Sequence, residues 1–338
     1  MSTGEPDRHV TIYDVASRAG VSITTVSNVL NRPGRVGAAT LRKVLAVIDE
    51  LGFTPKAAAV SQARKGVGRI GVLAPFSSYT SYHERLCGVL RAVRDTAFEV
   101  VVYDQESAAS ASSPLLSSLP TTGRLDGLLV LGLPLDPEMA DRLVQRNLPT
   151  VLVDSFQRGL STVNVDDEHG GFVLGQHLVG QGYRRFVYVS EAQRSDAFVS
   201  PGQLRLRGLR RAFARGGLPE ESLSHVITSH DIAGGRAAAK EIAGWVERPD
   251  VVIAHFDDIA AGVVAGFQEA GIRVPSDVAV AGYDDGPVAE AMGITTVRQP
   301  FFETGRVGGA LLIDQVQGVS SSVQHVELAA ELVVRTSA

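Results

Sequence analysis

From residue 70 onward, short apolar runs alternate with helical segments, and this alternation restricts the fold more than any other feature of the chain. The runs predicted as strands lie at 70–74, 100–103, 127–131, 150–153, 186–189, 251–254 and 278–282. Apolar residues at helical spacing predict helices at 83–94, 138–145, 171–181, 207–215, 235–246 and 259–270. Repeated β-α units of this kind predict an α/β fold of parallel sheets with helices on both faces.

The predicted units are numerous enough for two doubly wound sheets, each in a subdomain of its own. The segment 161–167 and the stretch near Thr295 are candidate crossings between the subdomains. We expect one α/β region at 68–338, with subdomains at about 68–160 plus 297–325 and about 161–296 plus 326–338. Ligands of doubly wound sheets bind outside the carboxyl ends of the strands, so two facing sheets predict a ligand cleft that closes by a hinge.

Residues 9–54 are predicted to form a separate helical module. Thr11 is a favourable helix N-cap, and Asp14, three residues later, completes a box-like cap. Gly20 ends this first helix where a left-handed backbone is easiest, and Ser22 caps the next one. Two short helices joined by a tight glycine turn predict a helix-turn-helix.

The second helix, predicted at 23–30, has an apolar inward face and short polar side chains elsewhere. These polar groups, with the cap residue, are Ser22, Thr24, Thr25, Ser27 and Asn28. Such groups can reach phosphates and base edges in a major groove, whereas a purely structural hairpin more often carries Lys/Glu pairs there. A third helix at 38–51, ended by Gly52, is predicted to pack against the first two.

The net charge of −5 conceals an uneven distribution along the chain. Residues 1–66 hold nine basic and five acidic residues, whereas the remainder holds 23 basic and 32 acidic residues. A small basic head on an acidic body is typical of a nucleic-acid-binding module attached to a sensor or an enzyme. From charge alone, an uneven surface without a partner is an equal alternative.

Cysteine content and hydropathy exclude several classes of protein. The single cysteine, Cys87, excludes an intrachain disulfide framework and a cysteine-based zinc cluster, and its place in a predicted helix favours packing over reactivity. The N-terminus has no apolar segment of a secretory signal, and no apolar run approaches the roughly 18 residues of a membrane span. We therefore expect a cytoplasmic protein.

The stretch VTIYDVASRAGVSITTVSNVLNRPGRVGAATLRKVLAVIDELGFTP resembles the DNA-binding head of the lactose-repressor (LacI/GalR) family. The family pattern T-I-x-D-V-A-x-x-A-G-V-S-x-x-T-V-S-x-V-L-N is matched nearly throughout. Because this pattern fixes more than a dozen positions at once, the resemblance is specific. It implies a helix-turn-helix domain at 9–54 that binds double-stranded DNA.

By position, the resemblance implies two groups of DNA-contacting residues in the head. Ile23, Thr24 and Asn28 would read bases. The residues that would hold phosphates are Thr11, Tyr13, Ser22, Thr25, Ser27, Asn31 and Thr40. Asn28 can pair bidentately with adenine, whereas Ile23 can contact only a thymine methyl group or a sugar.

The segment 55–67 matches the family's hinge, which becomes helical on DNA and enters the minor groove. Its implied DNA contacts are Lys56, Ala59 and Gln62. Relatives carry a leucine at position 62 that wedges between bases, and glutamine here removes that apolar wedge. The departure affects the expected bending of the DNA rather than DNA binding itself.

The resemblance continues through the body, in the segments DGLLVLG, VDDEHGG, RLRGLRRAF, FDDIAAGVV, VPSDVAVAGYDD and ITTVRQPFFETG. These match the family's effector domain, which is similar to periplasmic sugar-binding proteins. Carried over by position, the polar residues that hold the effector are Asp154, Arg205, Asp284 and Gln299. Aromatic and imidazole groups at pocket-lining positions are Phe76, Tyr82 and His230. Arginine and aspartate at strand ends suit the recognition of hydroxyl groups.

Two positions depart from the sugar-binding relatives. Gly132 and Phe256 stand where some of them carry asparagine, which leaves fewer hydrogen bonds and a more apolar wall. This puts a simple galactoside in doubt. For each residue alone a structural role is also open: Asp154 can cap a loop, and Phe256 can belong to the core.

Other chemistry is not favoured by the sequence. The G-x-G-x-x-G at 66–71 runs into a predicted strand rather than a helix, which argues against dinucleotide binding. Neither a G-x-S-x-G elbow nor a G-x-x-x-x-G-K-[ST] loop is present. His255, Asp257 and Asp258 resemble metal ligands, yet the two acids open a helix, where negative charge is favourable. We expect neither a metal nor a cofactor.

The resemblance therefore implies a ligand-responsive transcriptional regulator, most often a repressor in this family, and not an enzyme. It would bind a near-palindromic operator as a homodimer, because one helix-turn-helix reads only a half-site. A small molecule, a sugar or related metabolite, would control DNA affinity from the interdomain cleft. The chain ends shortly after ELVVR without the leucine-rich tail that joins two dimers in some relatives, which favours a plain dimer at the nucleoid, with no membrane partner.

An alternative from another class is a cytoplasmic solute-binding or enzymatic α/β protein whose helical head serves assembly. A binding protein for transport needs a signal or lipid anchor, which the N-terminal sequence does not contain. An enzyme needs a nucleophile or an acid–base pair, and Asp154 with Asp284 is the one such pair that the sequence offers.

Overall fold

A computed structural model describes residues 10–53, 67–105, 118–119, 121, 123–193 and 199–338. The chain divides into two compact units, which are described separately. The first unit contains residues 1–78, 86–162 and 305–324, and the second contains residues 79–85, 163–304 and 325–338. The α/β fold with an N-terminal helix-turn-helix, expected from the sequence, is confirmed.

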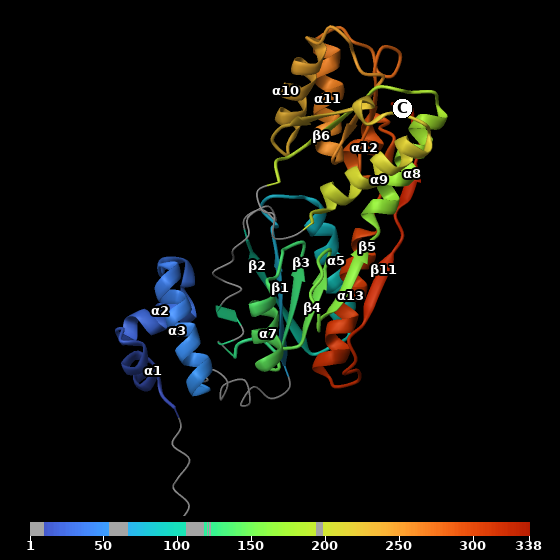
Figure 1. The fold of residues 1–338 in the computed structure, drawn as a ribbon. Coiled ribbons are helices and arrows are strands. Elements are labelled where there is room, and N and C mark those ends of the chain that lie inside the picture. The colour runs from blue at the N-terminus through green and yellow to red at the C-terminus, as the bar shows by residue number, and fades with distance from the viewer. Residues whose placement is uncertain (1–9, 54–66, 106–117, 120, 122, 194–198) are drawn as a thin grey trace, which may run out of the picture. The chain divides into compact units, whose positions relative to one another are not determined.

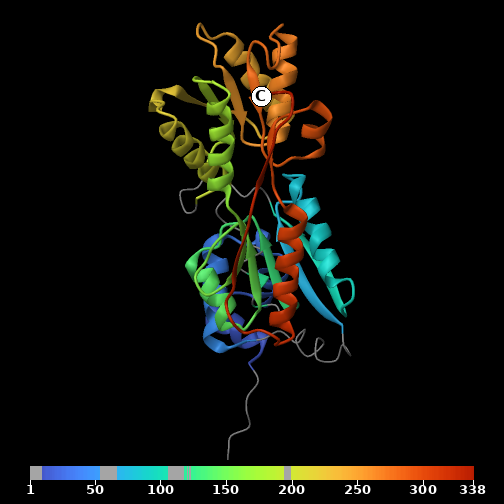
Figure 2. The same ribbon diagram turned by 90° about the vertical axis from the view of Figure 1, so that its right-hand side faces the viewer.

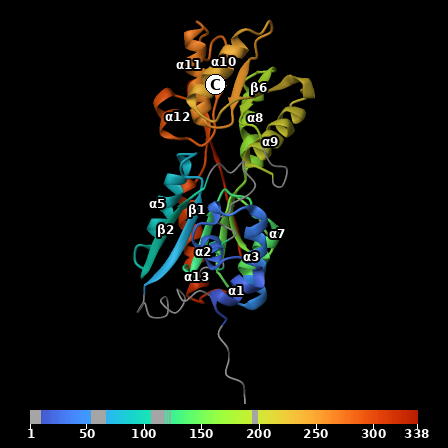
Figure 3. The ribbon, with the colours of Figure 1, turned by 90° about the vertical axis from the view of Figure 1, so that its left-hand side faces the viewer.

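The helical head consists of α1 (Ile12–Ala19), α2 (Ile23–Asn31), a 3-10 turn (Pro33–Arg35) and α3 (Ala38–Leu51), as Figure 3 shows. Thr11 and Asp14 form the reciprocal capping box predicted from the sequence. Gly20 and Gly52 end their helices at φ 63°, where glycine has no steric penalty. The buried residues at the centre of this small core are Val15, Ala19, Val26, Val29, Leu41, Val44, Leu45 and Ile48.

The first unit also contains most of a six-stranded sheet in the order β11-β5-β4-β3-β1-β2. Its strands are β1 (Gly68–Ala74), β2 (Phe98–Asp104), β3 (Gly127–Leu131), β4 (Thr150–Val153), β5 (Ser161–Val165) and β11 (His325–Leu328). Strands β1 to β4 pair in parallel, as predicted. The G-x-G-x-x-G residues that are described belong to β1 or precede it, so no helix opens there.

Helices cover both faces of this sheet. On one face, α7 (Pro137–Gln145) buries Met139 and Leu143 against Leu128 and Val130 of β3. On the other face, α13 (Phe301–Val316) passes so close to β3 that a Cβ atom at Gly127 would meet the side chain of Val316. In Figure 2, α13 (red) runs beside α5 (Ser81–Val93, cyan). Such three-layer packing is typical of a parallel sheet that is buried on both sides.

The second unit is built on a parallel sheet in the order β7-β6-β8-β9. Its strands are β6 (Phe186–Ser190), β7 (Leu223–Ile227), β8 (Val251–Ala254) and β9 (Ala279–Ala281). Its helices, labelled in Figure 1, are α8 (Asp167–Gly180), α9 (Pro201–Arg215), α10 (Ile232–Ala243), α11 (Asp257–Glu269) and α12 (Pro287–Met292).

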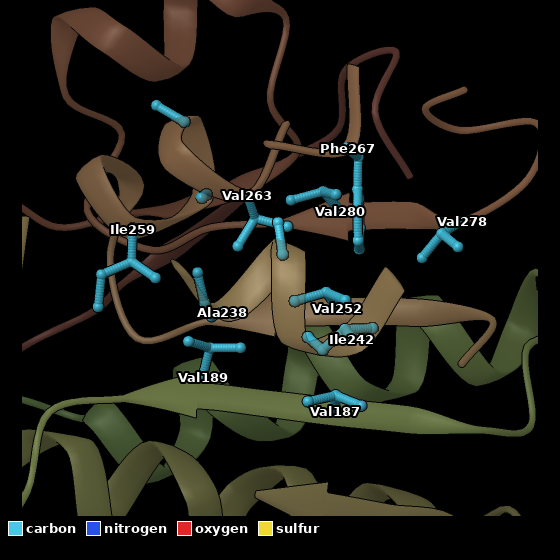
Figure 4. Close-up of a cluster of buried hydrophobic side chains, with 14 of the residues drawn as sticks. Val187, Val189, Ala238, Ile242, Val252, Ile259, Val263, Phe267, Val278 and Val280 are labelled. Carbon is cyan, nitrogen blue, oxygen red and sulfur yellow. The ribbon is translucent and has the colours of Figure 1, made fainter. Parts of the chain in front are cut away.

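Alternate residues of each strand in this sheet belong to two different cores. Val187 and Val189 of β6 pack with α10 and α11, in the cluster drawn in Figure 4. Phe186 and Tyr188, between them in sequence, pack with α8 and α9 instead. Successive side chains of a strand point to opposite faces of the sheet. Because both faces of this sheet are buried, residues 186–189 of β6 are apolar at every position. Because the four strands pair in parallel, their carboxyl ends lie at one edge of the sheet, between the two helical layers.

Several strands were not predicted. β7 and β11 are half exposed and carry polar residues, so they lack the continuous apolar run that identified the central strands. β10 (Thr296–Arg298) and β12 (Glu331–Val333) form a two-stranded antiparallel ribbon, which the expectation of purely parallel sheets did not include.

Cys87 lies in α5 as predicted but is exposed, so the expected packing role is wrong. In the described residues, no helix is long and apolar enough to span a membrane.

Candidate functional sites

The second helix of the head presents its polar side chains outward. The Ser22 hydroxyl caps α2 by accepting a hydrogen bond from the backbone N–H of Thr25, 3.1 Å away. Thr24 is exposed and Asn28 is half-buried, and their spacing of four residues puts them on one face of the helix. Ile23, beside them, leaves 41% of its surface exposed although it is apolar. An exposed face of this kind is available to the edges of bases.

The residues predicted to hold phosphates lie on α1, α2 and α3 or cap these helices. Tyr13 is 68% exposed on α1, which is unusual for so large an aromatic side chain. The Asn31 side-chain amide donates to the carbonyl and hydroxyl oxygens of Ser27, which fixes the end of α2. Thr40 lies in the first turn of α3. The predicted hinge contacts Lys56, Ala59 and Gln62 lie outside the described residues.

In the second unit, the buried Arg205 of α9 is the centre of a polar cluster at the carboxyl edge of the sheet. Its Nε donates to Asp167 Oδ1 at 2.8 Å, and its Nη1 donates to the carbonyl oxygen of His255 at 2.7 Å. Its Nη2 lies 3.5 Å from Asp284 Oδ1, and its guanidinium stacks on the Tyr283 ring at 3.8 Å. Arg205 is thus fixed in direction from four sides, as a rigid ligand-binding group requires.

Asp167 reaches Arg205 because α8 and α9 approach each other unusually closely. A Cβ atom at Gly171 would lie 2.2 Å from the Arg205 carbonyl oxygen, and one at Gly208 would lie 2.0 Å from that of Glu168. Only glycine permits so close an approach of two backbones. The glycines therefore place the N-terminal turn of α8, with Asp167, directly beside the Arg205 side chain.

Burial controls the charge of this cluster. Burial raises the pKa of Asp284 to about 6, although Arg205, a hydrogen bond from Gln299 and the charge of Arg85 act in the opposite sense. Burial opposes the charged form of Arg205, but Asp167 and Asp284 more than offset it, so its pKa lies above that of a free arginine. The cluster therefore combines a permanent cation with a carboxyl group that can change its protonation near neutral pH.

A second buried carboxyl group, Asp257, lies at the start of α11. It accepts hydrogen bonds from the Thr296 hydroxyl and from the backbone N–H of Gly286, both at 2.8 Å. Burial, reinforced by the nearby Asp284, raises its pKa to about 8. Asp257 therefore carries a proton at neutral pH.

Gln299 and Asp284 are brought together as predicted, with Gln299 Nε2 donating to Asp284 Oδ1 at 3.1 Å. Tyr82, His230 and Phe256 are also brought together, because their ring centroids lie 6.1, 5.2 and 6.2 Å from the ring of Tyr79. The Tyr79 hydroxyl donates to Glu191 at the end of β6. An aromatic wall thus accompanies the polar cluster within one unit.

Sequence reasoning missed several members of this site. Asp167 belongs to the quoted segment VDDEHGG but was not singled out, because its partner lies on a different helix. Tyr79 was missed although it shares a short aromatic segment with Tyr82, which was the available signal. Arg85 was also missed; it is buried and stacks on the rings of Tyr82 and Phe301.

Two predicted effector residues belong to the other unit. Phe76 follows β1, and Asp154 follows β4 with a positive φ of 55°. Both follow the carboxyl ends of their strands, as the sequence predicted, and their contact with an effector stays a prediction.

Among the described residues, no group of three His, Cys, Asp or Glu side chains could hold a metal ion. Asp257 and Asp258 open α11 as predicted, but burial raises the pKa of both, so the protonated Asp257 does not supply the negative charge that was expected at this helix N-terminus.

Comparison with known proteins gives two family matches. Residues 11–56 match the model described as "Bacterial regulatory proteins, lacI family", and residues 176–338 match "Periplasmic binding protein-like domain". The ribose operon repressor of Escherichia coli is 31% identical over 97% of this chain and 99% of its own length. The HTH-type transcriptional repressor PurR of Photobacterium profundum is 30% identical over 97% of this chain and 98% of its own length.

A solved structure is similar over nearly the whole chain. The lac repressor dimer bound to operator and the anti-inducer ONPF has a TM-score of 0.69 and 25% identity, covering 98% of this chain and 99% of that one. The similarity therefore includes the helical head as well as the α/β parts of both units.

Proposed function

This chain belongs to the LacI family of bacterial regulatory proteins and is a ligand-responsive DNA-binding regulator, and we propose that α2 reads its operator while Arg205, Asp284 and Gln299 hold its effector. The observation that carries the effector proposal is the buried Arg205, whose guanidinium contacts Asp284 at the carboxyl edge of the second unit's sheet. This edge is where doubly wound sheets bind ligands.

The operator proposal assigns base reading to Thr24 and Asn28 on the exposed face of α2. An asparagine amide can accept a hydrogen bond from the adenine amino group and donate one to the adjacent ring nitrogen, a pair of contacts that the other bases do not offer. Asn28→Ala should therefore flatten the preference at one base pair of each half-site, at a cost of about 1–3 kcal/mol for the preferred base. Tyr13→Phe is the control, because loss of a phosphate contact should weaken all sequences alike.

A gel-shift series over operators substituted at each position separates these outcomes. The assignment of Asn28 is wrong if its alanine variant keeps the base profile of the wild type. The proposed partner state is a homodimer on a near-palindrome, which the dimeric, operator-bound lac repressor supports by similarity.

The effector site favours a small, largely neutral ligand with several hydroxyl groups. The buried cations Arg205 and Arg85 are balanced by the carboxylates Asp167 and Asp284, so a strongly charged ligand would leave an uncompensated charge in a buried site. Arg205, Asp284 and Gln299 can exchange their mutual hydrogen bonds for bonds to hydroxyl groups, while the aromatic wall contacts the apolar face of a sugar ring. A sugar or related metabolite is therefore the proposed class, and the ribose operon repressor among the relatives makes D-ribose the first probe.

The test compares operator affinity in fluorescence anisotropy with D-ribose, with other pentoses and hexoses, and with a purine base. A compound that shifts the wild type should lose about 100-fold in affinity in Arg205→Met, because the lost contacts to a buried charge are worth about 3 kcal/mol. Arg211→Met is the matched control, since Arg211 lies on the same helix but is exposed and pairs with Glu168. The site assignment fails if Arg205→Met responds to the compound as Arg211→Met and the wild type do.

Arg205→Met leaves the Asp167 carboxylate buried without its partner, so the variant is also made together with Asp167→Asn. The double variant removes both charges and should keep the fold while still failing to respond.

We further propose that the protein has no enzymatic activity and acts on nucleoid DNA in the cytoplasm. A fluorescent fusion that does not overlap the nucleoid would contradict the latter.

A further inference from the structure

The turn that follows β9 has an uncommon backbone conformation. Asp284 and Asp285, in succession, have φ values of 110° and 60°. Residues with a Cβ atom rarely adopt positive φ, and such strain persists only where the surroundings hold it. The turn carries the Asp284 carboxyl group of the candidate effector site, so whatever holds the turn also directs that group.

The side chain of Asp285 supplies a contact that can hold this turn. It is only 6% exposed and lies between two arginines. Arg298 Nε donates to its Oδ2 at 2.7 Å, and Arg335 Nη2 donates to its Oδ1 at 2.6 Å. A carboxylate held on both oxygens has little freedom to rotate, and its backbone is fixed with it.

The two arginines differ in how firmly they are themselves held. The Arg298 side chain is 52% exposed and also contacts the exposed Glu331. The Arg335 side chain is 18% exposed, and its Nη1 donates to the Ile294 carbonyl oxygen at 2.9 Å. The backbone N–H of Arg335 donates to the Thr295 hydroxyl, also at 2.9 Å. Arg335 is therefore the better anchored of the two partners of Asp285.

Hydrogen bonds from backbone N–H groups hold the rest of the turn in place. The Asp284 N–H donates to the Val297 carbonyl oxygen at 2.8 Å, and the Gln299 N–H donates to the Asp284 carbonyl oxygen at 3.3 Å. The Gly286 N–H donates to the carboxyl group of Asp257. With Asp285 held between these bonds, the Asp284 side chain lies 3.5 Å from Arg205 Nη2 and 3.1 Å from Gln299 Nε2.

We propose that Asp285 and Arg335 are positioning residues of the effector site. Their ion pair keeps the 284–286 turn in the conformation that directs the Asp284 carboxyl group at Arg205 and Gln299. Arg335 follows β12, so the C-terminal strand contributes to ligand recognition through this pair without supplying a ligand-contacting group. The inference rests on the proposed effector role of Arg205 and Asp284.

Amide hydrogen exchange in the full-length protein, without any added ligand, tests this role. The compared variants are Arg335→Met and Arg298→Met, each of which removes one partner of the same carboxylate and keeps an apolar stem. Peptides that cover residues 282–299 should exchange at least tenfold faster in Arg335→Met and less than threefold faster in Arg298→Met. Peptides from β6 and α10 should be unchanged in both.

Two results would overturn the proposal. Exchange at 282–299 that is the same in Arg335→Met as in the wild type shows that the turn holds itself. Faster exchange throughout the second unit shows that Arg335 only stabilises the fold. Asp285→Asn, which keeps the shape of the side chain and removes its charge, should reproduce the Arg335→Met pattern, and the double variant should exchange no faster than either single variant.

A crystal structure of the Arg335→Met protein gives the second readout. The Asp284 carboxyl group should turn away from Arg205, beyond the 3.5 Å of the wild type, and an unchanged Asp284 conformation refutes the positioning role. Because neither experiment contains an effector, their failure leaves the proposed function intact. Failure of the Arg205→Met comparison, in contrast, refutes the proposed effector site and leaves the account of the turn untouched.

Discussion

Asp257 provides a quantitative test of the electrostatics at the carboxyl edge of the second sheet. Its side chain is buried at the start of α11, and its pKa is raised from 3.8 to about 8, first by burial and then by the charge of Asp284. In the unfolded chain the same carboxyl group loses its proton near pH 4. Folding at neutral pH therefore requires Asp257 to take up a proton.

The sign of the effect follows from this proton uptake. A carboxyl group with a raised pKa contributes stability that is present at low pH and is lost as the pH rises through the folded-state pKa. Between pH 5 and pH 8, the free energy of unfolding of the wild type should fall by about 3.5 kcal/mol on account of Asp257 alone. Asp257→Asn mimics the protonated group, because its amide can donate to the Thr296 hydroxyl and accept from Gly286, and it requires no proton.

The assay is denaturant unfolding at pH 5 and pH 8, followed by the fluorescence of Trp245. This is the only tryptophan of the chain, and it packs against the core of the second unit, so its signal reports that unit. The stability difference between Asp257→Asn and the wild type should shift by about 3–4 kcal/mol in favour of the variant from pH 5 to pH 8. A difference that stays constant between the two pH values refutes the buried, protonated state of Asp257.

Asp250 offers a control of the opposite kind. Burial alone would raise the pKa of Asp250. Hydrogen bonds from the backbone N–H groups of Arg184 and Arg185 outweigh burial and lower this pKa below the usual range. Its stabilising effect is therefore fully present above pH 5 and is lost only in more acidic solution. Asp250→Asn should destabilise the second unit by the same amount at pH 5 and at pH 8.

Three further predictions concern other parts of the chain. Gly208→Ala should destabilise the second unit by about 1–3 kcal/mol in the same Trp245 assay, because the added Cβ atom would collide with the Glu168 carbonyl oxygen. An unfolding midpoint equal to that of the wild type contradicts the close α8–α9 contact. Ser22→Ala should cost the head about 1 kcal/mol in calorimetry through the lost N-cap, and a larger loss of operator affinity than of stability would show an additional phosphate contact. Gln62→Leu should increase operator bending in circular-permutation assays by restoring an apolar wedge, and equal, large bends in both proteins would show that the wedge lies elsewhere.

The helical head could be predicted from the sequence almost residue by residue. Its signals are local: the Thr11–Asp14 box, the glycines at 20 and 52, and apolar residues at helical spacing. The central strands β3, β4 and β8 were likewise predicted with their observed ends, because strands buried on both faces are apolar throughout.

The parts that were missed depend on partners distant in sequence. β12 becomes a strand because β10 pairs with it, and its own residues carry little signal. Asp167 joins the site because glycines on α8 and α9 let two backbones meet, a tertiary contact that local patterns do not encode. Arg205, Asp284 and Gln299 were predicted through the family resemblance, whereas the Asp285–Arg335 pair became visible only in the folded chain.

The central claim is that this chain is a DNA-binding regulator and that the two heads of its homodimer read a twofold-symmetric operator. Selection of binding sites from random-sequence DNA by the full-length protein tests it most directly, followed by titration of the enriched sequence at several salt concentrations. We predict a near-palindrome bound by two chains, with an affinity that falls steeply as salt rises because phosphate contacts release counterions. Failure to enrich any sequence, or enrichment of a single asymmetric site bound by one chain, would contradict the account.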